Sequence, residues 1–378
     1  CFMKTTGTSV ELLTALDRGA YREAIKRYEG SQPSDDPVET IWRAEVALYL
    51  SQLEDARAEL DRLPALLDRD LANRVRIIRA ELAFCETALD EAVELIGPAI
   101  QSTWEVGDHE RHLRAILLRA RIELRRGNSD EALERLKEPR RLAAVLGNDF
   151  YAGIIAHCRA FAFYNQADQK QAGQAFSEAL HLLSRSEGLR WEGTCRTLYG
   201  AYLADISRYE DSLKECEIGE RMAMEVGYVA DALFARNNAG NTLALLGRFE
   251  EVVERLMDLL DWQRSTQHIY AEQAGLMLLS SALCELGRYD EAEKAAIELA
   301  RLSEISGHKS HELTGKMMAA WANARAGKPG AVEALQALVE VADNEGSDYE
   351  RAEVRLYLAD ALTATRPDLA FALCREAR

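Results

Sequence analysis

The segment LGRYDEAEKAA, at Leu286–Ala296, decides the fold because the chain repeats it at a fixed interval. Most copies read as a short turn, an acidic pair and a small residue that opens an apolar helical face. Aligned on that small residue, the copies recur every forty residues, at Ala92, Ala132, Ala172, Ser212, Val252, Ala292 and Val332. Weaker copies place Ala24, Ala56 and Ala370. A period this regular predicts one supersecondary unit used many times over.

Each repeat predicts two helices joined by short turns. The second helix begins at the acidic pair, because negative charge stabilises a helix N-terminus. It ends near a glycine that suits a left-handed cap, at Gly107, Gly147, Gly188, Gly227 or Gly307. Small residues in the first helix let a neighbouring helix approach closely, at Ala120, Ala160, Gly200, Gly240, Ser280 and Ala320.

The composition narrows the class of protein. The 378 residues are 48% hydrophobic and 29% charged, a normal globular balance, and no run alternates with the period of a strand. A net charge of −17 opposes direct binding to nucleic acid. No apolar run reaches the ~20 residues of a membrane helix, and the first residues lack the apolar core of a signal peptide. The seven cysteines have no CxxC spacing and read as reduced thiols. We therefore expect a cytoplasmic protein with no membrane partner.

The pattern of small residue, Leu-Gly, aromatic, acidic pair and Ala resembles the signature of the tetratricopeptide (TPR) repeat family. The resemblance extends from about Val10 to the C-terminus. The forty-residue period is similar to the subtype found in sensor regions of bacterial transcription activators, in peptide-regulated Rap-type proteins and in kinesin light chains. The resemblance implies an all-α fold, a right-handed superhelical solenoid of about ten TPR-like repeats. In such a fold the first helices line a concave groove.

The expected organisation is a single continuous solenoid over residues 1–378. It divides into irregular N-terminal repeats at 1–80, regular forty-residue repeats at 81–345 and an incomplete C-terminal repeat at 346–378. The last segment, DLAFALCREAR, stops partway through a second helix, which predicts a piece of a longer protein.

Two departures from the repeat predict local irregularity. Second helices carry a proline in mid-helix, at Pro64, Pro98 and Pro139, and proline removes a backbone hydrogen bond and kinks a helix. The loop glycine is replaced at Ala167 and Ser207.

A basic, aromatic patch is the first candidate binding site. Arg114, Arg121 and Arg125 share one helical face, because they lie at i, i+7 and i+11. The first helix of the next repeat adds His157, Phe161, Tyr164 and Asn165. Together these residues suit an acidic peptide or a phosphate. The alternative is a set of solvated arginines that pair with nearby acidic residues such as Asp108 and Glu123.

The segment RNNAGN, at Arg236–Asn241, is the second candidate site. Asn237, Asn238 and Asn241 need a reason in mid-helix, because an asparagine side chain competes for backbone groups. The TPR resemblance implies that such asparagines, with Arg236 beside them, bind the backbone of an extended peptide. An amide both donates and accepts hydrogen bonds, which suits that role. The alternative is hydrogen bonding between repeats.

The sequence offers no catalytic constellation. It has no GxxxxGK[ST], HExxH or GxSxG motif, and its histidine pairs at His109/His112 and His308/His311 lack further ligands. We therefore expect no catalytic residue, no metal and no cofactor.

The predicted function is a non-catalytic scaffold or sensor that binds a protein or peptide segment in the concave groove, as the regulatory region of a larger bacterial signalling or transcription-regulatory protein. The alternatives are a small-ligand sensor, the regulatory arm of a TPR-fused enzyme such as a caspase-like protease, and self-association through terminal repeats. A closed pocket favours a small ligand, and an open groove favours a peptide.

Overall fold

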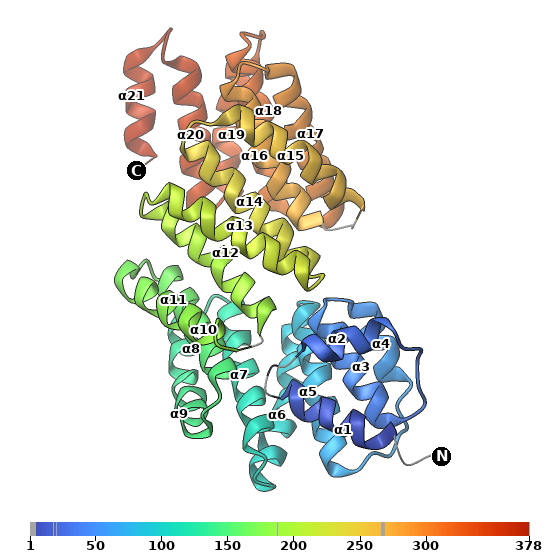
Figure 1. The fold of residues 1–378 in the computed structure, drawn as a ribbon. Coiled ribbons are helices and arrows are strands. Elements are labelled where there is room, and N and C mark those ends of the chain that lie inside the picture. Colours follow the sequence, from blue (N-terminus) through green and yellow to red (C-terminus); the bar gives the residue numbers. More distant parts are fainter. Residues whose placement is uncertain (1–4, 18, 20, 187, 266–268, 378) are drawn as a thin grey trace. The chain divides into compact units, whose positions relative to one another are not determined.

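The chain is described by a computed structural model that covers residues 5–17, 19, 21–186, 188–265 and 269–377. All regular structure in these ranges is helical, which confirms the predicted all-α fold (Figure 1). Contacts divide the chain into two compact units. Unit 1 comprises residues 1–206 and 218–232, and unit 2 comprises residues 207–217 and 233–378. The single continuous solenoid over 1–378 stays a prediction, and each unit is described by itself.

The helices follow one another in pairs along the chain. Unit 1 contains α1 (Thr5–Leu16), α2 (Arg22–Glu29), α3 (Pro37–Tyr49), α4 (Leu53–Asp61), α5 (Arg69–Cys85), α6 (Leu89–Glu105), α7 (His109–Arg125), α8 (Ser129–Arg135), α9 (Lys137–Leu146), α10 (Asp149–Asn165), α11 (Gln169–Leu183) and α12 (Leu189–Asp205). Two helices have residues in both units, α13 (Tyr209–Glu225) and α14 (Val229–Leu245). Unit 2 continues with α15 (Phe249–Ser265), α16 (Ile269–Glu285), α17 (Tyr289–Ser306), α18 (Lys309–Arg325), α19 (Ala331–Glu345), α20 (Asp348–Leu362) and α21 (Pro367–Glu376).

A left-handed residue recurs every forty residues in the turn that joins the two helices of a repeat. Its φ angle lies between 56° and 80° at Thr87, Gly127, Ala167, Ser207, Gly247, Gly287 and Gly327. The turn keeps this conformation at Ala167 and Ser207, where the loop glycine is replaced, although a side chain disfavours it. The packing of the repeat therefore maintains the left-handed backbone conformation at this position even when the residue is not glycine.

The predicted left-handed caps of the second helices are confirmed at all but one position. Gly107, Gly147, Gly227 and Gly307 have φ angles between 62° and 74°. The prediction is wrong for Gly188, which has φ −79° and precedes α12 as its N-cap. The forty-residue series passes through position 187, which lies outside the described residues.

The three prolines act differently. Pro139 lies near the start of α9, where the second helix of its repeat is divided at Leu136 into α8 and α9. Pro98 lies inside α6, which continues through it to Glu105. The mid-helix assignment is wrong for Pro64, because α4 ends at Asp61 and Pro64 follows it. The residue before a proline disfavours the helical conformation, so a helix tends to end ahead of it.

Most anchor residues of the repeat are buried between helices, and Val332 is half-buried. Ala92, Ala132 and Ala172 in unit 1 are 0% exposed, and so are Ser212 and Ala292 in unit 2. First helices also pack on the next first helix, as α5 does on α7 and α16 on α18. Stacked repeats thus bury one another's apolar faces, which a single repeat cannot do alone.

Candidate functional site

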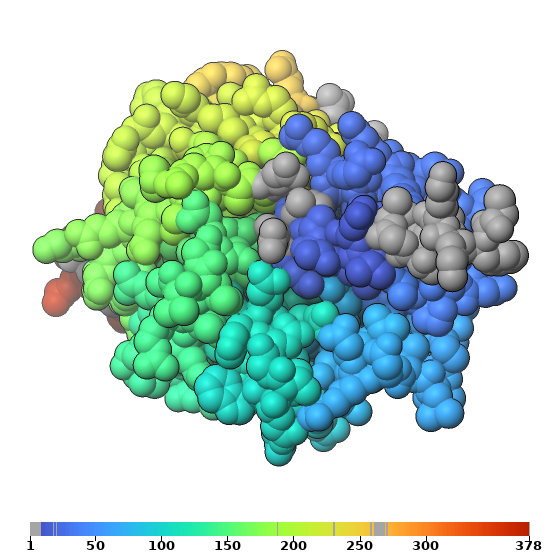
Figure 2. Space-filling view, turned by 60° about the horizontal axis from the view of Figure 1, so that its bottom comes forward, coloured from blue at the N-terminus to red at the C-terminus, as the bar shows by residue number. Residues whose placement is uncertain are grey.

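First helices of unit 1 form a closed inner ring. Helix α3 packs on α5, α5 on α7, α7 on α10, and α10 on α12. The ring is completed by Arg190 at the start of α12, whose Nη1 donates hydrogen bonds to the carbonyl oxygens of Tyr49 (2.5 Å) and Leu48 (3.4 Å) at the end of α3. The backbone N–H of Arg190 also donates to the Tyr49 hydroxyl at 3.1 Å. Figure 2 shows the N-terminal repeats, in blue, side by side with the green segments of this ring.

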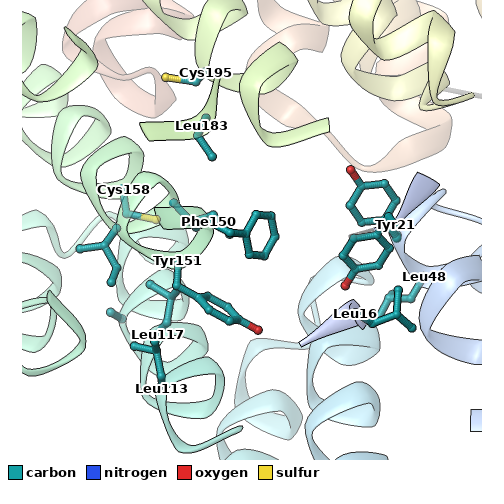
Figure 3. Close-up of a cluster of buried hydrophobic side chains, with 14 of the residues drawn as sticks. Leu16, Tyr21, Leu48, Leu113, Leu117, Phe150, Tyr151, Cys158, Leu183 and Cys195 are labelled. Carbon is teal, nitrogen blue, oxygen red and sulfur yellow. The ribbon is translucent and has the colours of Figure 1, made fainter. Parts of the chain in front are cut away.

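The ring lines a half-open cavity of about 70 Å³. Every first helix of the ring contributes to its wall, and the residues that precede α2 add Tyr21. Figure 3 shows Phe150 and Tyr151 of α10 pointing toward Tyr21 on the opposite side. The wall combines aromatic rings with charges, which are Glu45, Glu81, Arg114, Arg121 and Arg190.

A ladder of buried ion pairs forms one side of the cavity. Arg74 Nε donates to Glu45 at 2.9 Å, and its Nη1 donates to Asp17 at 2.8 Å. One repeat later, Arg114 pairs with Glu45 and with Glu81, the latter through Nε at 3.0 Å. Burial acts to raise the pKa of Glu45, but Arg114 and Arg74 outweigh it and lower that pKa. Both arginines are thus fully engaged within the protein.

Arg121 is held in a different way, between two aromatic rings. Its guanidinium carbon lies 4.8 Å from the ring centre of Phe84 and 4.8 Å from that of Trp191. Arg125, one turn later, lies 5.1 Å from the same Phe84 ring and is exposed. Neither arginine makes an ion pair with a carboxylate of the described residues. Glu123, the expected alternative partner, pairs with Arg119 and Arg126 instead.

His157 lies buried behind this clamp. Its ring packs edge-on against Trp191, with 5.9 Å between ring centres, and its Nδ1 has no partner in the described part of the chain. Burial, reinforced by the charge of Arg121, lowers the pKa of His157 to about 4. The imidazole is therefore neutral at pH 7.

The buried imidazole predicts a loss of stability in acid. The unfolded chain binds a proton on His157 near pH 6.5, whereas the folded chain does so only near pH 4. The free energy of unfolding should therefore fall by roughly 2 to 3 kcal/mol as the pH drops through that window. Urea denaturation at a series of pH values measures it. His157→Gln should flatten this dependence, and His181→Gln, at an exposed position, should not. Equal slopes for both variants would contradict the assignment.

The predicted patch of seven residues is only partly assembled. The structure brings Arg114 and Arg121 to the cavity wall, with His157 packed against Trp191 behind Arg121 and with Arg125 on the same Phe84 ring as Arg121. Phe161 packs into the core, and the Tyr164 hydroxyl donates a hydrogen bond to Asp205. Asn165 is exposed at the far end of α10, in an open depression beside the turn at Gly127–Asn128.

The asparagine segment lies in α14, and its three amides are in unit 2. Asn237 is buried, and its Nδ2 donates to the carbonyl of Ala271 in α16 at 3.2 Å, while its Oδ1 has no partner in the described residues. Asn238 and Arg236 are half-buried and engaged in interactions, and Asn241 is exposed. The Asn237 contact matches the alternative of hydrogen bonding between repeats.

The residues of this site that were not predicted from the sequence include Arg74, Glu45, Glu81, Arg190 and Trp191. For the first three the repeat does contain a signal, because Arg74 lies forty residues before Arg114 and occupies the same place in the preceding first helix. Glu45 and Glu81 are related in the same way across the shorter interval of the N-terminal repeats. An arginine and a glutamate that each recur at an equivalent position of successive first helices predict ion pairs between adjacent repeats. Arg190 and Trp191 carry no such signal.

Among the described residues, no three His, Cys, Asp or Glu side chains gather closely enough to hold a metal ion. Within the same residues, no helix combines the length and the apolar character needed to span a bilayer.

Comparison with known proteins identifies the fold. No known family profile matches the chain, and no curated protein matches it in sequence. Solved structures do match. A Rap protein complexed with competence and sporulation factor is 12% identical, with TM-score 0.67 over 91% of this chain and 97% of its own. NprR in complex with its cognate peptide NprX is 14% identical, with TM-score 0.55 over 92% and 98%. Aspartyl phosphate phosphatase F from Bacillus subtilis is 12% identical, with TM-score 0.61 over 92% and 94%. The chain thus has the TPR-like helical repeat fold that its sequence predicts.

Proposed function

We propose that this chain is a peptide-binding sensor module, and that its ligand inserts a side chain into the cavity of unit 1. The observation that carries the proposal is Arg121, which lies at the cavity between two aromatic rings and has no carboxylate partner in the described residues. A cation held this way at a ring of first helices is suited to receive an acidic group. NprR, which has the same fold, was solved with a peptide bound.

The wider role is the regulatory region of a larger bacterial signalling or transcription-regulatory protein in the cytoplasm. The module itself is proposed to be non-catalytic. Fold alone does not establish this, because one protein of the same fold bears the name of a phosphatase. Hydrolysis of a phosphorylated protein by the purified chain would contradict the proposal.

A small-ligand sensor is the second candidate, and the closure of the ring favours it. The cavity of about 70 Å³ lies well below the ~300 Å³ at which pockets for drug-sized ligands begin. A cavity of this volume suits one side chain or one small molecule.

The test is co-purification of endogenous peptides from the native host, read by mass spectrometry. Arg121→Glu should lose the bound species, because it places a negative charge where an acidic group would bind. Arg141→Glu is the matched control, since Arg141 is exposed on α9 of the same unit. The Asn237→Ala/Asn238→Ala variant tests the second candidate site. Retention of every bound species by both Arg121→Glu and the double variant would show that both site assignments are wrong.

A further inference from the structure

The charges around the cavity of unit 1 do not cancel. Glu45 is shared by Arg74 and Arg114, and Glu81 pairs with Arg114. The cavity wall therefore holds three arginines, Arg114, Arg121 and Arg190, and two glutamates that are already neutralised. Asp231 lies behind Arg190, and burial raises its pKa to about 6. Arg190 donates to the carbonyl oxygens of Leu48 and Tyr49, whereas Arg121 has neither a carboxylate partner nor a hydrogen-bond acceptor in the described residues, in a chain whose net charge is −17.

The rings of Phe84 and Trp191 restrict the movement of the Arg121 side chain, because its guanidinium carbon lies 4.8 Å from the centre of each ring. None of the guanidinium N–H donors of Arg121 meets an acceptor of the described residues, so they remain able to bind one. A guanidinium held in place loses little entropy when it forms a pair of parallel hydrogen bonds.

A second cation and a neutral neighbour complete the arrangement. The guanidinium carbon of Arg125 lies 5.1 Å from the centre of the same Phe84 ring, and Arg125 is exposed, so a ligand can reach it from solvent. His157 lies behind the clamp as a neutral imidazole and adds no charge to the site. The positive potential is thus concentrated on Arg121 and its neighbour.

We infer that Arg121, with Arg125 at the rim, binds a carboxylate group. This inference rests on the proposed sensor function and names the chemistry of its ligand. A cavity of about 70 Å³ has room for a carboxylate group. The wall holds three arginines and two glutamates, and this excess of one positive charge matches the single negative charge of a carboxylate better than the two charges of a phosphate dianion. The carboxylate belongs to an acidic peptide or to a free small acid.

Binding to the full chain tests the inference with four probes. Two are hexapeptide pools that differ only in a fixed glutamate or glutamine at the scanned position, the third is glutarate and the fourth is inorganic phosphate. The glutamate pool should bind on the order of tenfold to a hundredfold more tightly than the glutamine pool, because the glutamate carboxylate accepts a charge-assisted pair of hydrogen bonds from the Arg121 guanidinium. Arg121→Met should remove that preference and Arg141→Met should keep it, with the circular dichroism of both variants unchanged.

The outcomes separate this inference from the proposed function. If only glutarate binds, and Arg121→Met abolishes its binding, the carboxylate site stands and the peptide sensor fails. If peptides bind equally with glutamate or glutamine, or if Arg121→Met retains the preference, the carboxylate site is wrong and the peptide sensor stands. Preferential binding of phosphate, or binding of none of the four probes, overturns the carboxylate site.

Discussion

Arg74→Met should lower the free energy of unfolding by about 3–5 kcal/mol. Arg74 is 2% exposed, and its guanidinium donates to Glu45, to Asp17 and to the carbonyl oxygen of Leu13 at 2.9 Å. Removing it leaves buried Asp17 with only the more distant Arg111, whose Nε lies 4.0 Å away, and leaves Glu45 with Arg114 as its remaining cation. A buried carboxylate that loses its partner keeps the full cost of its desolvation.

Urea denaturation followed by circular dichroism measures this loss. Arg76→Met is the matched control, because Arg76 lies two residues away on α5 and is exposed. The control should change stability by less than about 0.5 kcal/mol, as expected for a surface position. Similar losses in the two variants would show that the ion-pair ladder does not stabilise the protein.

Phe176→Ala should also cost about 3–5 kcal/mol, through lost burial and the cavity that remains. Phe176 is 0% exposed in α11, and its ring centre lies 5.4 Å from that of Tyr199 and 5.6 Å from that of Tyr202. Those two rings belong to α12, so the cavity would open between one repeat and the next.

The matched control for this change is Phe371→Ala, at a side chain that is 68% exposed. Thermal and urea unfolding of both variants should show a large loss for the first and almost none for the second. If Phe176→Ala cost less than about 1 kcal/mol, the inter-repeat packing described for unit 1 would be wrong.

The sequence was enough to predict the repeat and most of its backbone. An interval of forty residues identified the anchors, and the buried Ala92 and Ala172 confirm them. The glycines of the sequence also predicted the left-handed residues at which several second helices end, because that conformation depends on the local residue type. The prediction failed at Gly188, which has a φ angle of −79° and precedes α12 as its N-cap. A structural feature that depends only on residues nearby in sequence, or on the adjacent repeat, recurs with the period of the repeat and can therefore be recognised in the sequence.

The candidate site was only partly predictable, because it depends on contacts between distant repeats. Arg121 and His157 were found, since helical spacing places them on adjacent first helices. The clamp itself needs Trp191, seventy residues beyond Arg121, and ring closure needs Arg190 to reach Tyr49. Such a contact follows from the curvature of several repeats together, and no local pattern records it. For the same reason Arg114 could be placed on the correct face, but its partner Glu45 could not.

Ring closure changes how unit 1 is expected to lose its structure. In a linear array each repeat touches only its neighbours, so unfolding begins at the ends and spreads inward. The bonds from Arg190 to Leu48 and Tyr49 span about 140 residues and remove such ends from the stretch between α3 and α12. We therefore expect the helices from α3 to α12 to unfold together as one cooperative unit. A ligand that strengthened or broke the hydrogen bonds of Arg190 would then change the stability of every repeat in this stretch, including repeats that the ligand does not touch.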